Sequence, residues 1–263
     1  MFFIYVGIYN CLMPIKRIPT GITELDQILE GGYPAGHGLL VRGPPGAGKT
    51  ILATHLLYRS CKDGKKCMLM LTHVNVENFL EQAENIGFDF QKCIESGKLL
   101  ITKSFEIRSN KIHNASRLGS GIGFLEKDCV QSVQEIPDDV EVVVIDNLDM
   151  LSLYHTVEEF ADKFFTINDI LSNKRCTSLF LMGQEESQVK DSIAEHIAFG
   201  GINLYVSRDE RTGKGLRQLY IPKMRCTNIS LEPMSFRITP AGIKIEKIFQ
   251  RDEVLRGALD LVV

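Results

Sequence analysis

The 263-residue sequence predicts an α/β protein with a central, mostly parallel, twisted sheet, flanking helices and antiparallel strands near the C-terminus. Three observations support this fold class. Short apolar runs of strand length alternate with helical patterns through most of the chain. A glycine-rich loop joins the first of these runs to a helix. Hairpin turn signals separate the last strand-like segments.

The first half of the chain alternates strands and helices. Residues 18–34 fit a short helix that ends at Gly31-Gly32, and residues 38–42 form the first apolar strand. A helix then runs to about Lys62, followed by a strand over 67–71, a helix over 76–87 and a strand over 99–102. Residues 104–123 are rich in Ser, Asn and Gly, and we expect a mobile surface insertion there.

The second half completes the sheet. A helix from about Phe124 leads into the apolar run 140–145, followed by a helix over 157–173 and a strand over 178–182. The antiparallel finish is predicted over 202–206, 216–222, 235–238 and 243–245, with turn signals at 211–215 and 240–242.

Composition and charge narrow the class of protein. Hydrophobic residues make up 44% and charged residues 24%, as in ordinary soluble globular proteins. The net charge of −3 gives no support to a large nucleic-acid-binding surface. The seven cysteines are odd in number and show no C-x-x-C pair, which indicates reduced thiols in the cytoplasm, most of them packed in the core.

The first thirteen residues are apolar and carry no acid or base. They are too short to span a bilayer, and no basic segment precedes them. Two interpretations are open, an added edge strand or a misassigned start with translation beginning at Met13, and we favour the second. The predicted organisation is this extension over 1–13, one nucleotide-binding domain over 14–250 and a tail over 251–263, with no membrane segment.

The segment Gly43–Thr50, GPPGAGKT, is a complete phosphate-binding loop between a predicted strand and a predicted helix. Its glycines would let backbone N–H groups converge on phosphate oxygens at the positive end of the helix. Lys49 would reach the β- and γ-phosphates, and the Thr50 hydroxyl would ligate Mg²⁺. A Gly/Pro turn that happens to end in Lys-Thr is the alternative. The predicted binding residues are Gly43, Pro44, Pro45, Gly46, Ala47, Gly48, Lys49, Thr50 and Ile51.

A second metal contact is predicted where the run Glu141–Asp146, EVVVID, ends. Asp146 would lie at the carboxyl tip of this strand, where ligands bind in open α/β sheets, and would hold the water shell of Mg²⁺. The alternative is an aspartate that caps a turn before Asn147.

These motifs belong to a longer pattern that resembles a RecA-type ATPase domain. Its segments are TGITELDQILEGGYP, GPPGAGKT, GKKCMLML, NIGFDF, VVVIDNLDML, GINLYVS and PKMRC…FRITPAGIKI. More narrowly, residues 17–248 resemble KaiC and the single-domain archaeal KaiC-like and RadA-paralogue proteins. The resemblance implies a RecA-like P-loop NTPase fold, ATP and Mg²⁺ as cofactors, and a homo-oligomer, a ring (hexamer) or dimer, with nucleotide between subunits.

In that family a Lys and an Arg of the adjacent subunit touch the γ-phosphate, and they match Lys223 and Arg225 here, with Thr227 as a further contact in trans. One intervening residue would place both cations on one side of a strand, where they could neutralise phosphate charge. A solvated basic edge strand is the alternative. Cys226 replaces the usual Gly and Ile229 replaces a His of KaiC, so we expect a remodelled loop.

Hydrolysis needs a polar group that orients the attacking water. KaiC-like domains place two glutamates directly after the second strand, and His73 and Val74 occupy those positions here. Lys49 is therefore the main catalytic candidate. His73 and Glu77 are weaker ones, because a His at a strand end is often structural and an acid on a first helical turn commonly serves the helix dipole. We expect slow or absent hydrolysis, since a base contributes about 10²–10⁴-fold in rate.

Three functions follow from these features. The leading one is a nucleotide-dependent assembly or regulatory switch, with an unidentified protein partner expected downstream. The second is a RadA-paralogue-type accessory of DNA recombination and repair. It is disfavoured because residues 149–163 and 184–197, after two strand ends, are acidic where phosphate attraction needs the opposite sign. The third is an ATPase motor that uses His73 or Glu77.

Overall fold

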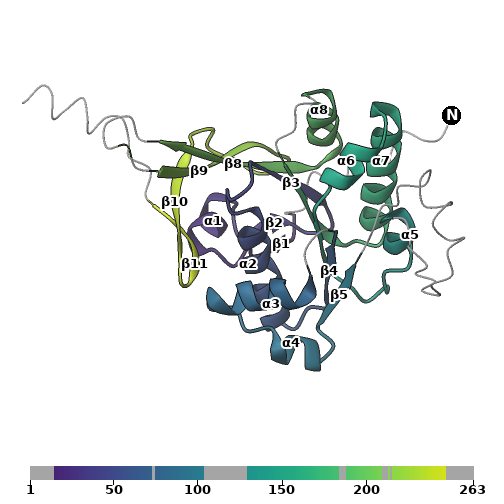
Figure 1. Ribbon diagram of the computed structural model, residues 1–263, viewed down its shortest axis with the longest axis horizontal. Helices are drawn as coiled ribbons and strands as arrows, with labels where there is room; N and C mark the ends of the chain where they lie inside the picture. The colour runs from purple at the N-terminus through teal and green to yellow at the C-terminus, as the bar shows by residue number, and fades with distance from the viewer. Residues whose placement is uncertain are drawn as a thin grey trace, which may run out of the picture.

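The computed structural model describes residues 15–72, 75–103, 129–183, 188–208, 213 and 215–246. They form a nine-stranded sheet in the order β11-β10-β9-β8-β3-β7-β6-β4-β5, with helices on both faces (Figure 1). The predicted N-terminal extension, the insertion over 104–123 and the C-terminal tail lie outside the described residues.

Six neighbouring strands of this sheet are parallel. In spatial order they are β8 (Gly200–Arg208), β3 (Gly38–Arg42), β7 (Thr177–Met182), β6 (Val142–Asp146), β4 (Cys67–Leu71) and β5 (Leu99–Lys103). The central members are continuous apolar runs because helices cover both of their faces. This block confirms the predicted parallel sheet, with strand ends within about two residues of those expected.

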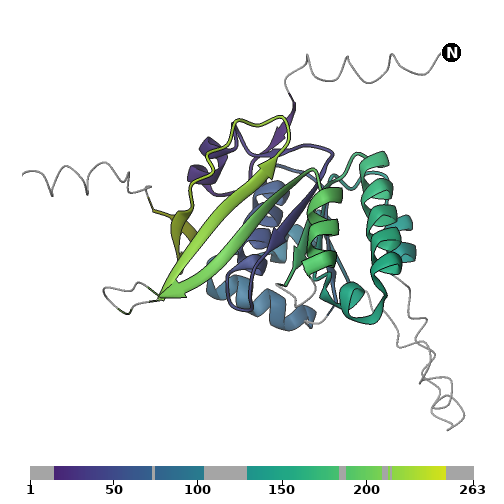
Figure 2. The ribbon, with the colours of Figure 1, turned by 90° about the horizontal axis from the view of Figure 1, so that it is seen from above.

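The antiparallel part consists of β9 (Gly215–Met224), β10 (Met234–Thr239) and β11 (Gly242–Ile245). It begins one strand later than the sequence indicated, because β8 runs parallel to β3 and antiparallel to β9. The last β3–β8 pair is Arg42–Asn203, so β8 continues beyond β3 as a two-stranded ribbon with β9 (Figure 2). This ribbon passes beside the carboxyl end of β3.

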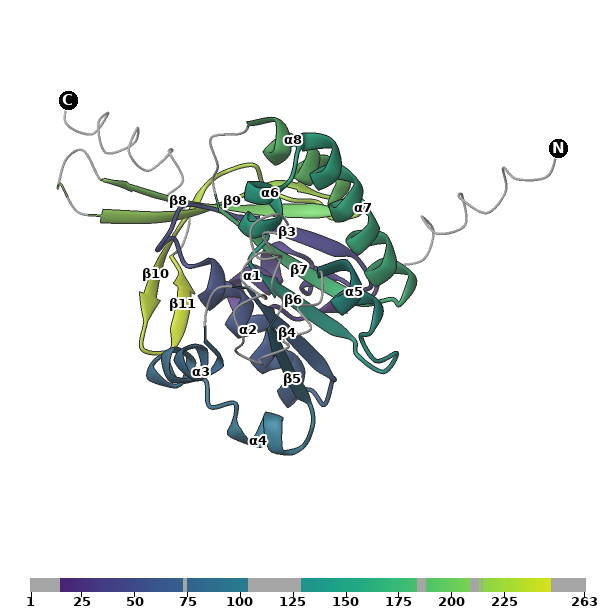
Figure 3. The ribbon, with the colours of Figure 1, turned by 45° about the vertical axis from the view of Figure 1, so that its right-hand side comes forward.

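One face of the sheet is covered by α1 (Thr23–Ile28), α2 (Lys49–Lys62), α3 (Val76–Asn85) and α4 (Gln91–Glu95) (Figure 3). The other face carries α5 (Cys129–Gln134), α6 (Asp149–Tyr154), α7 (Val157–Asn173) and α8 (Gln188–Ile197). The predictions missed α4 and α6, and also the short ladder between β1 (Arg17–Ile18) and β2 (Tyr33–Pro34). None of the described helices is long and apolar enough to cross a bilayer.

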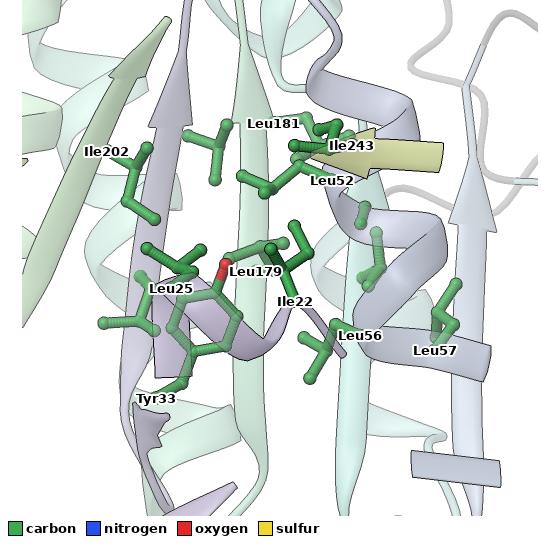
Figure 4. Packing of buried hydrophobic residues seen from close by; sticks show 14 of the residues in the cluster. Ile22, Leu25, Tyr33, Leu52, Leu56, Leu57, Leu179, Leu181, Ile202 and Ile243 are labelled. Carbon is green, nitrogen blue, oxygen red and sulfur yellow. The ribbon is translucent and has the colours of Figure 1, made fainter. Parts of the chain in front are cut away.

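The larger core cluster lies between the sheet and α2. Leu52, Leu56 and Leu57 of this helix are fully buried and pack with strand residues such as Leu179 and Leu181 (Figure 4). Burial of each such side chain stabilises the fold by about 1.5–3 kcal/mol. Because α2 is held on nearly every side, its N-terminus, which carries the glycine-rich loop, has a fixed position.

His55 of α2 joins three segments of the chain and is 5% exposed. Its Nε2 accepts a hydrogen bond of 2.8 Å from the backbone N–H of Ile243 on β11. The other ring nitrogen, Nδ1, lies 3.1 Å from the carbonyl oxygen of Gly21 and therefore carries the proton that it donates. Burial lowers the pKa of this imidazole, which favours its neutral form in the fold.

Candidate nucleotide site

The glycine-rich loop connects the carboxyl end of β3 to the first turn of α2. Gly46 and Gly48 have φ angles of 76° and 110°, which side chains rarely adopt. A Cβ on Gly43 would lie 2.6 Å from the carbonyl oxygen of Leu204, so the close passage of β8 requires glycine there. Gly48 is the N-cap of α2. The free N–H groups of the first turn, and the positive end of the helix, therefore belong to this loop.

Lys49 spans the loop. Its Nζ donates to the carbonyl oxygens of Gly43 at 2.5 Å and Pro44 at 3.2 Å. Burial lowers the pKa of Lys49, while the carboxylates of Asp149 and Asp146 oppose that shift. An ammonium group beside two carboxylates and a cluster of backbone donors suits a polyanion that carries a divalent cation.

Thr50 and Asp146 meet as predicted. The Thr50 hydroxyl donates a 2.8 Å hydrogen bond to Oδ2 of Asp146, which is 8% exposed at the end of β6. The carboxylate therefore faces the loop, and this favours the metal-binding role over a turn cap. A hydroxyl and a carboxylate at this spacing are oxygen ligands of the kind that Mg²⁺ prefers. Bound Mg²⁺ would neutralise phosphate charge here, with Thr50 as ligand and Asp146 holding its water shell.

Three further residues, which the predictions did not assign, tie the strand ends around this site. Thr72, after β4, accepts a 2.9 Å hydrogen bond from the N–H of Asn147 and donates to the Asn147 carbonyl at 3.1 Å. Asp149 accepts from the side chain of Asn147 at 2.6 Å and from the N–H of Gly183 at 2.5 Å. The polar residues Asp146, Asn147 and Asp149, at the end of an apolar strand and just after it, are the sequence signal for this network.

Arg217 is another residue beside the loop that the predictions did not assign. It lies on β9, is half-buried, and donates from Nε to the carbonyl oxygen of Gly46 at 3.3 Å. A positive charge therefore approaches the glycine-rich loop from the same copy of the chain. Its position depends on the β8–β9 register, which no local sequence pattern specifies.

Of the two candidates for water activation, His73 and Glu77, only Glu77 lies within the described residues. His73 and Val74 lie outside the described residues. Glu77 is on the first turn of α3 and exposed, as the sequence predicted. The N-cap of this helix is Asn75, whose side-chain oxygen accepts from the N–H of Val76. The catalytic role of Glu77 stays a prediction.

Lys223, Arg225 and Thr227 lie at the opposite end of the sheet from the loop. Met224, the last residue of β9, pairs with Gly200, and Gly200 pairs with Leu39 near the start of β3. Arg225 follows the end of β9 and is exposed, so only Lys223 of the two cations lies within the strand. Neither lies beside the glycine-rich loop of its own copy.

Lys223 has partners within its own copy. Its ammonium group donates to the carbonyl oxygens of Glu195 at 2.7 Å and Ala198 at 2.6 Å, at the C-terminal end of α8. Burial lowers the pKa of Lys223, and the nearby Arg225 lowers it further. A cation at this end of a helix is favoured by the helix dipole. Lys223 therefore has a structural role in one copy, in addition to any contact with another.

The turn after β9 keeps a backbone shape that suits glycine. Cys226 has a φ of 56°, within the left-handed region that non-glycine residues enter at a cost of about 1–2 kcal/mol. The cysteine at this position therefore changes the side chain and retains the conformation that glycine favours. Of the other described cysteines, Cys61, Cys67, Cys93, Cys129 and Cys176 are buried, as predicted for core thiols.

Comparisons with known proteins identify the family. The family model "ATPase: KaiC" matches residues 18–249. A UPF0273 protein of Thermotoga maritima is 30% identical over 88% of this chain and 96% of its own length. A UPF0273 protein of Methanopyrus kandleri is 27% identical over 91% of this chain and 96% of its own.

The fold has a solved counterpart in the crystal structure of a KaiC-like protein from Pyrococcus horikoshii. The TM-score is 0.71 at 24% sequence identity, over 89% of this chain and all of the other. With the family match and the loop geometry, it confirms the expected RecA-like P-loop architecture. The chain belongs to the KaiC ATPase family, a nucleotide-binding group of the RecA superfamily.

Proposed function

We propose that this protein is a nucleotide-operated assembly switch. Mg-ATP binds at the glycine-rich loop of one copy, and Lys223, Arg225 and Thr227 of a neighbouring copy contact its terminal phosphate. The homo-oligomer, a ring or a dimer, then forms only while ATP is bound. Nucleotide occupancy carries the signal to a protein partner.

The exposed position of Arg225, far from its own loop, carries this proposal. Met224 lies two strands away from β3, at the level of Leu39. Leu39 precedes Arg42, the last residue of β3, by three residues. At about 3.3 Å per residue and about 4.8 Å per strand, the separation between Met224 and Arg42 is roughly 14 Å. β9 runs away from the loop, so Arg225 lies farther still. A guanidinium group placed in this way is suited to phosphate on another copy, which it can bind through two parallel hydrogen bonds.

Hydrolysis in this proposal is slow. Lys49, the loop amides and the neighbour's cations stabilise phosphate charge, but Val74 and His73 replace the two acids of related domains. Without a well-placed base the rate falls by about 10²–10⁴-fold. A long-lived ATP state suits a switch better than a motor, which would need turnover of about one per second or more.

DNA binding has less support. Residues 188–197 carry a single lysine, Lys190, and its ammonium group donates to the carbonyl oxygens of Ser152 and His155. The first turn of α7 presents the exposed Glu158 and Glu159, and carboxylates repel a phosphate backbone. A steep salt dependence of single-stranded DNA binding at micromolar affinity would restore this alternative.

The test is the mass of the purified protein by light scattering, with and without Mg-ATP. We expect the wild type to assemble with Mg-ATP, and Arg225→Gln to remain near the monomer mass at the same protein concentration. Arg59→Gln is the matched control, because it removes an exposed arginine whose partner, Asp63, caps the C-terminus of the same helix. If Arg225→Gln assembles like the wild type, Arg225 does not bridge copies and the proposal is wrong.

A further inference from the structure

We propose that Arg17 and Glu30 are positioning residues for the contacts in trans. We call these two residues the N-terminal clamp. They hold the turn after β9 in the shape from which Arg225 and Thr227 can reach a neighbour's phosphate. This inference rests on the proposed function, and it assigns a role to the start of the domain, about 200 residues before that turn.

Arg17, on β1, makes two hydrogen bonds to the turn. Its Nη1 donates to the Thr227 hydroxyl at 2.7 Å, and its Nη2 donates to the Cys226 carbonyl oxygen at 2.7 Å. The Arg17 side chain is 13% exposed, and its hydrogen bond to Thr227 is partly buried, whereas the one to Cys226 is exposed. A planar fork of donors is needed to reach both acceptors at once, and lysine does not provide it.

Glu30 completes the clamp from the end of α1. Its Oε2 accepts from Nη2 of Arg17 at 3.2 Å, and its Oε1 accepts from the backbone N–H of Asn228 at 3.3 Å. Arg17 and Glu30 therefore bind three successive residues of the turn: the carbonyl oxygen of Cys226, the hydroxyl of Thr227 and the backbone N–H of Asn228. The first of these three residues, Cys226, has the left-handed backbone.

Arg225 is supported on its other side by the residues before β8. Its backbone N–H donates to the Phe199 carbonyl oxygen at 3.3 Å, and its guanidinium carbon lies 5.8 Å from the centre of the Phe199 ring. His37 stacks on the same ring at 3.7 Å and 11°. The backbone at Arg225 is therefore fixed between this aromatic pair and the clamp, while its guanidinium group remains exposed.

Preorganisation is the physical reason for the effect. A charged side chain that is already oriented loses less conformational entropy when it meets phosphate. Breaking the fork would let the turn leave its strained left-handed shape, so that Arg225 and Thr227 would sample many positions. ATP-dependent assembly should then need a higher protein concentration, about tenfold for the loss of one or two charge-assisted hydrogen bonds.

The experiment measures the protein concentration at half-assembly in saturating Mg-ATP, at a temperature well below unfolding. Arg17→Lys keeps the charge and removes the fork, and we expect it to raise this concentration about tenfold. Glu30→Gln should shift it in the same direction. Ile167→Val, in the buried face of α7, is the stability control. It lowers the unfolding temperature, but a folded sample of it should assemble like the wild type.

The outcomes separate the two proposals. If the wild type does not assemble with Mg-ATP, the switch is wrong and the role of the clamp falls with it. If the wild type assembles and Arg225→Gln does not, the switch stands. In that case, an Arg17→Lys variant that assembles like Ile167→Val would show that the clamp serves stability alone, and the inference would be overturned.

Discussion

Replacing Cys226 with glycine should stabilise the folded protein, although it removes a side chain. The residue has a φ of 56°, which costs a non-glycine residue about 1–2 kcal/mol. Glycine loses more backbone entropy on folding, by about 0.5–1 kcal/mol. The exposed thiol is lost, but the carbonyl oxygen that Arg17 binds is retained. The net expected gain is about 0.5–1 kcal/mol.

Thermal unfolding without nucleotide is the appropriate assay. For a chain of this size, that gain corresponds to a rise of about 1–4 °C in the unfolding temperature. Arg175, exposed at a φ of 57° after the end of α7, is a matched control, and Arg175→Gly should give a similar rise. Glu30 has a φ of 54° but binds Arg17 and Asn228, so Glu30→Gly should not be stabilising. A stabilised Arg175→Gly beside an unchanged or weakened Cys226→Gly would refute the reasoning.

Three further predictions concern the site and the buried ionisable groups. Asp146→Asn should lower the affinity for ATP in the presence of Mg²⁺ by about 10–100-fold and leave the affinity for ATP in a metal chelator unchanged. Calorimetry measures both affinities. Lys223→Met should cost about 1–3 kcal/mol in urea unfolding without nucleotide, because the carbonyl oxygens at the end of α8 lose their donor. Burial depresses the pKa of His55, so its contribution to stability is present above about pH 6.5 and is lost as the pH falls through the folded value. His55→Gln should lose less free energy of unfolding than the wild type between pH 7.5 and pH 5. An equal slope of this free energy against pH in wild type and variant would contradict the prediction.

Local sequence patterns predicted the elements that local physics determines. The glycine-rich loop, the boundaries of α2 and the strand that ends at Asp146 follow from apolar periodicity and turn chemistry. The contact between Thr50 and Asp146 follows as well, because the parallel strands β3 and β6 end at the same edge of the sheet, with β7 between them.

Other features depend on tertiary contacts and could not be predicted in this way. The α4 and α6 helices are five and six residues long, too short for a clear helical period. Arg17 meets Thr227 across 210 residues, and Arg217 reaches Gly46 across 171. The pairing of β1 with β2 and the register of β8 with β9 bring these pairs together, and only the assembled sheet determines both.

The most direct test of the account mixes two inactive variants. We expect Lys49→Ala to lose ATP binding and to keep Arg225. We expect Arg225→Gln to bind ATP and to lack the contact that a neighbour needs. Each alone should remain monomeric in Mg-ATP. Their equimolar mixture should contain one intact junction per pair, and light scattering should show a species of about twice the 29.6 kDa mass of the chain. A mixture that stays monomeric, while the wild type assembles, would contradict the claim that one copy completes the nucleotide site of the next.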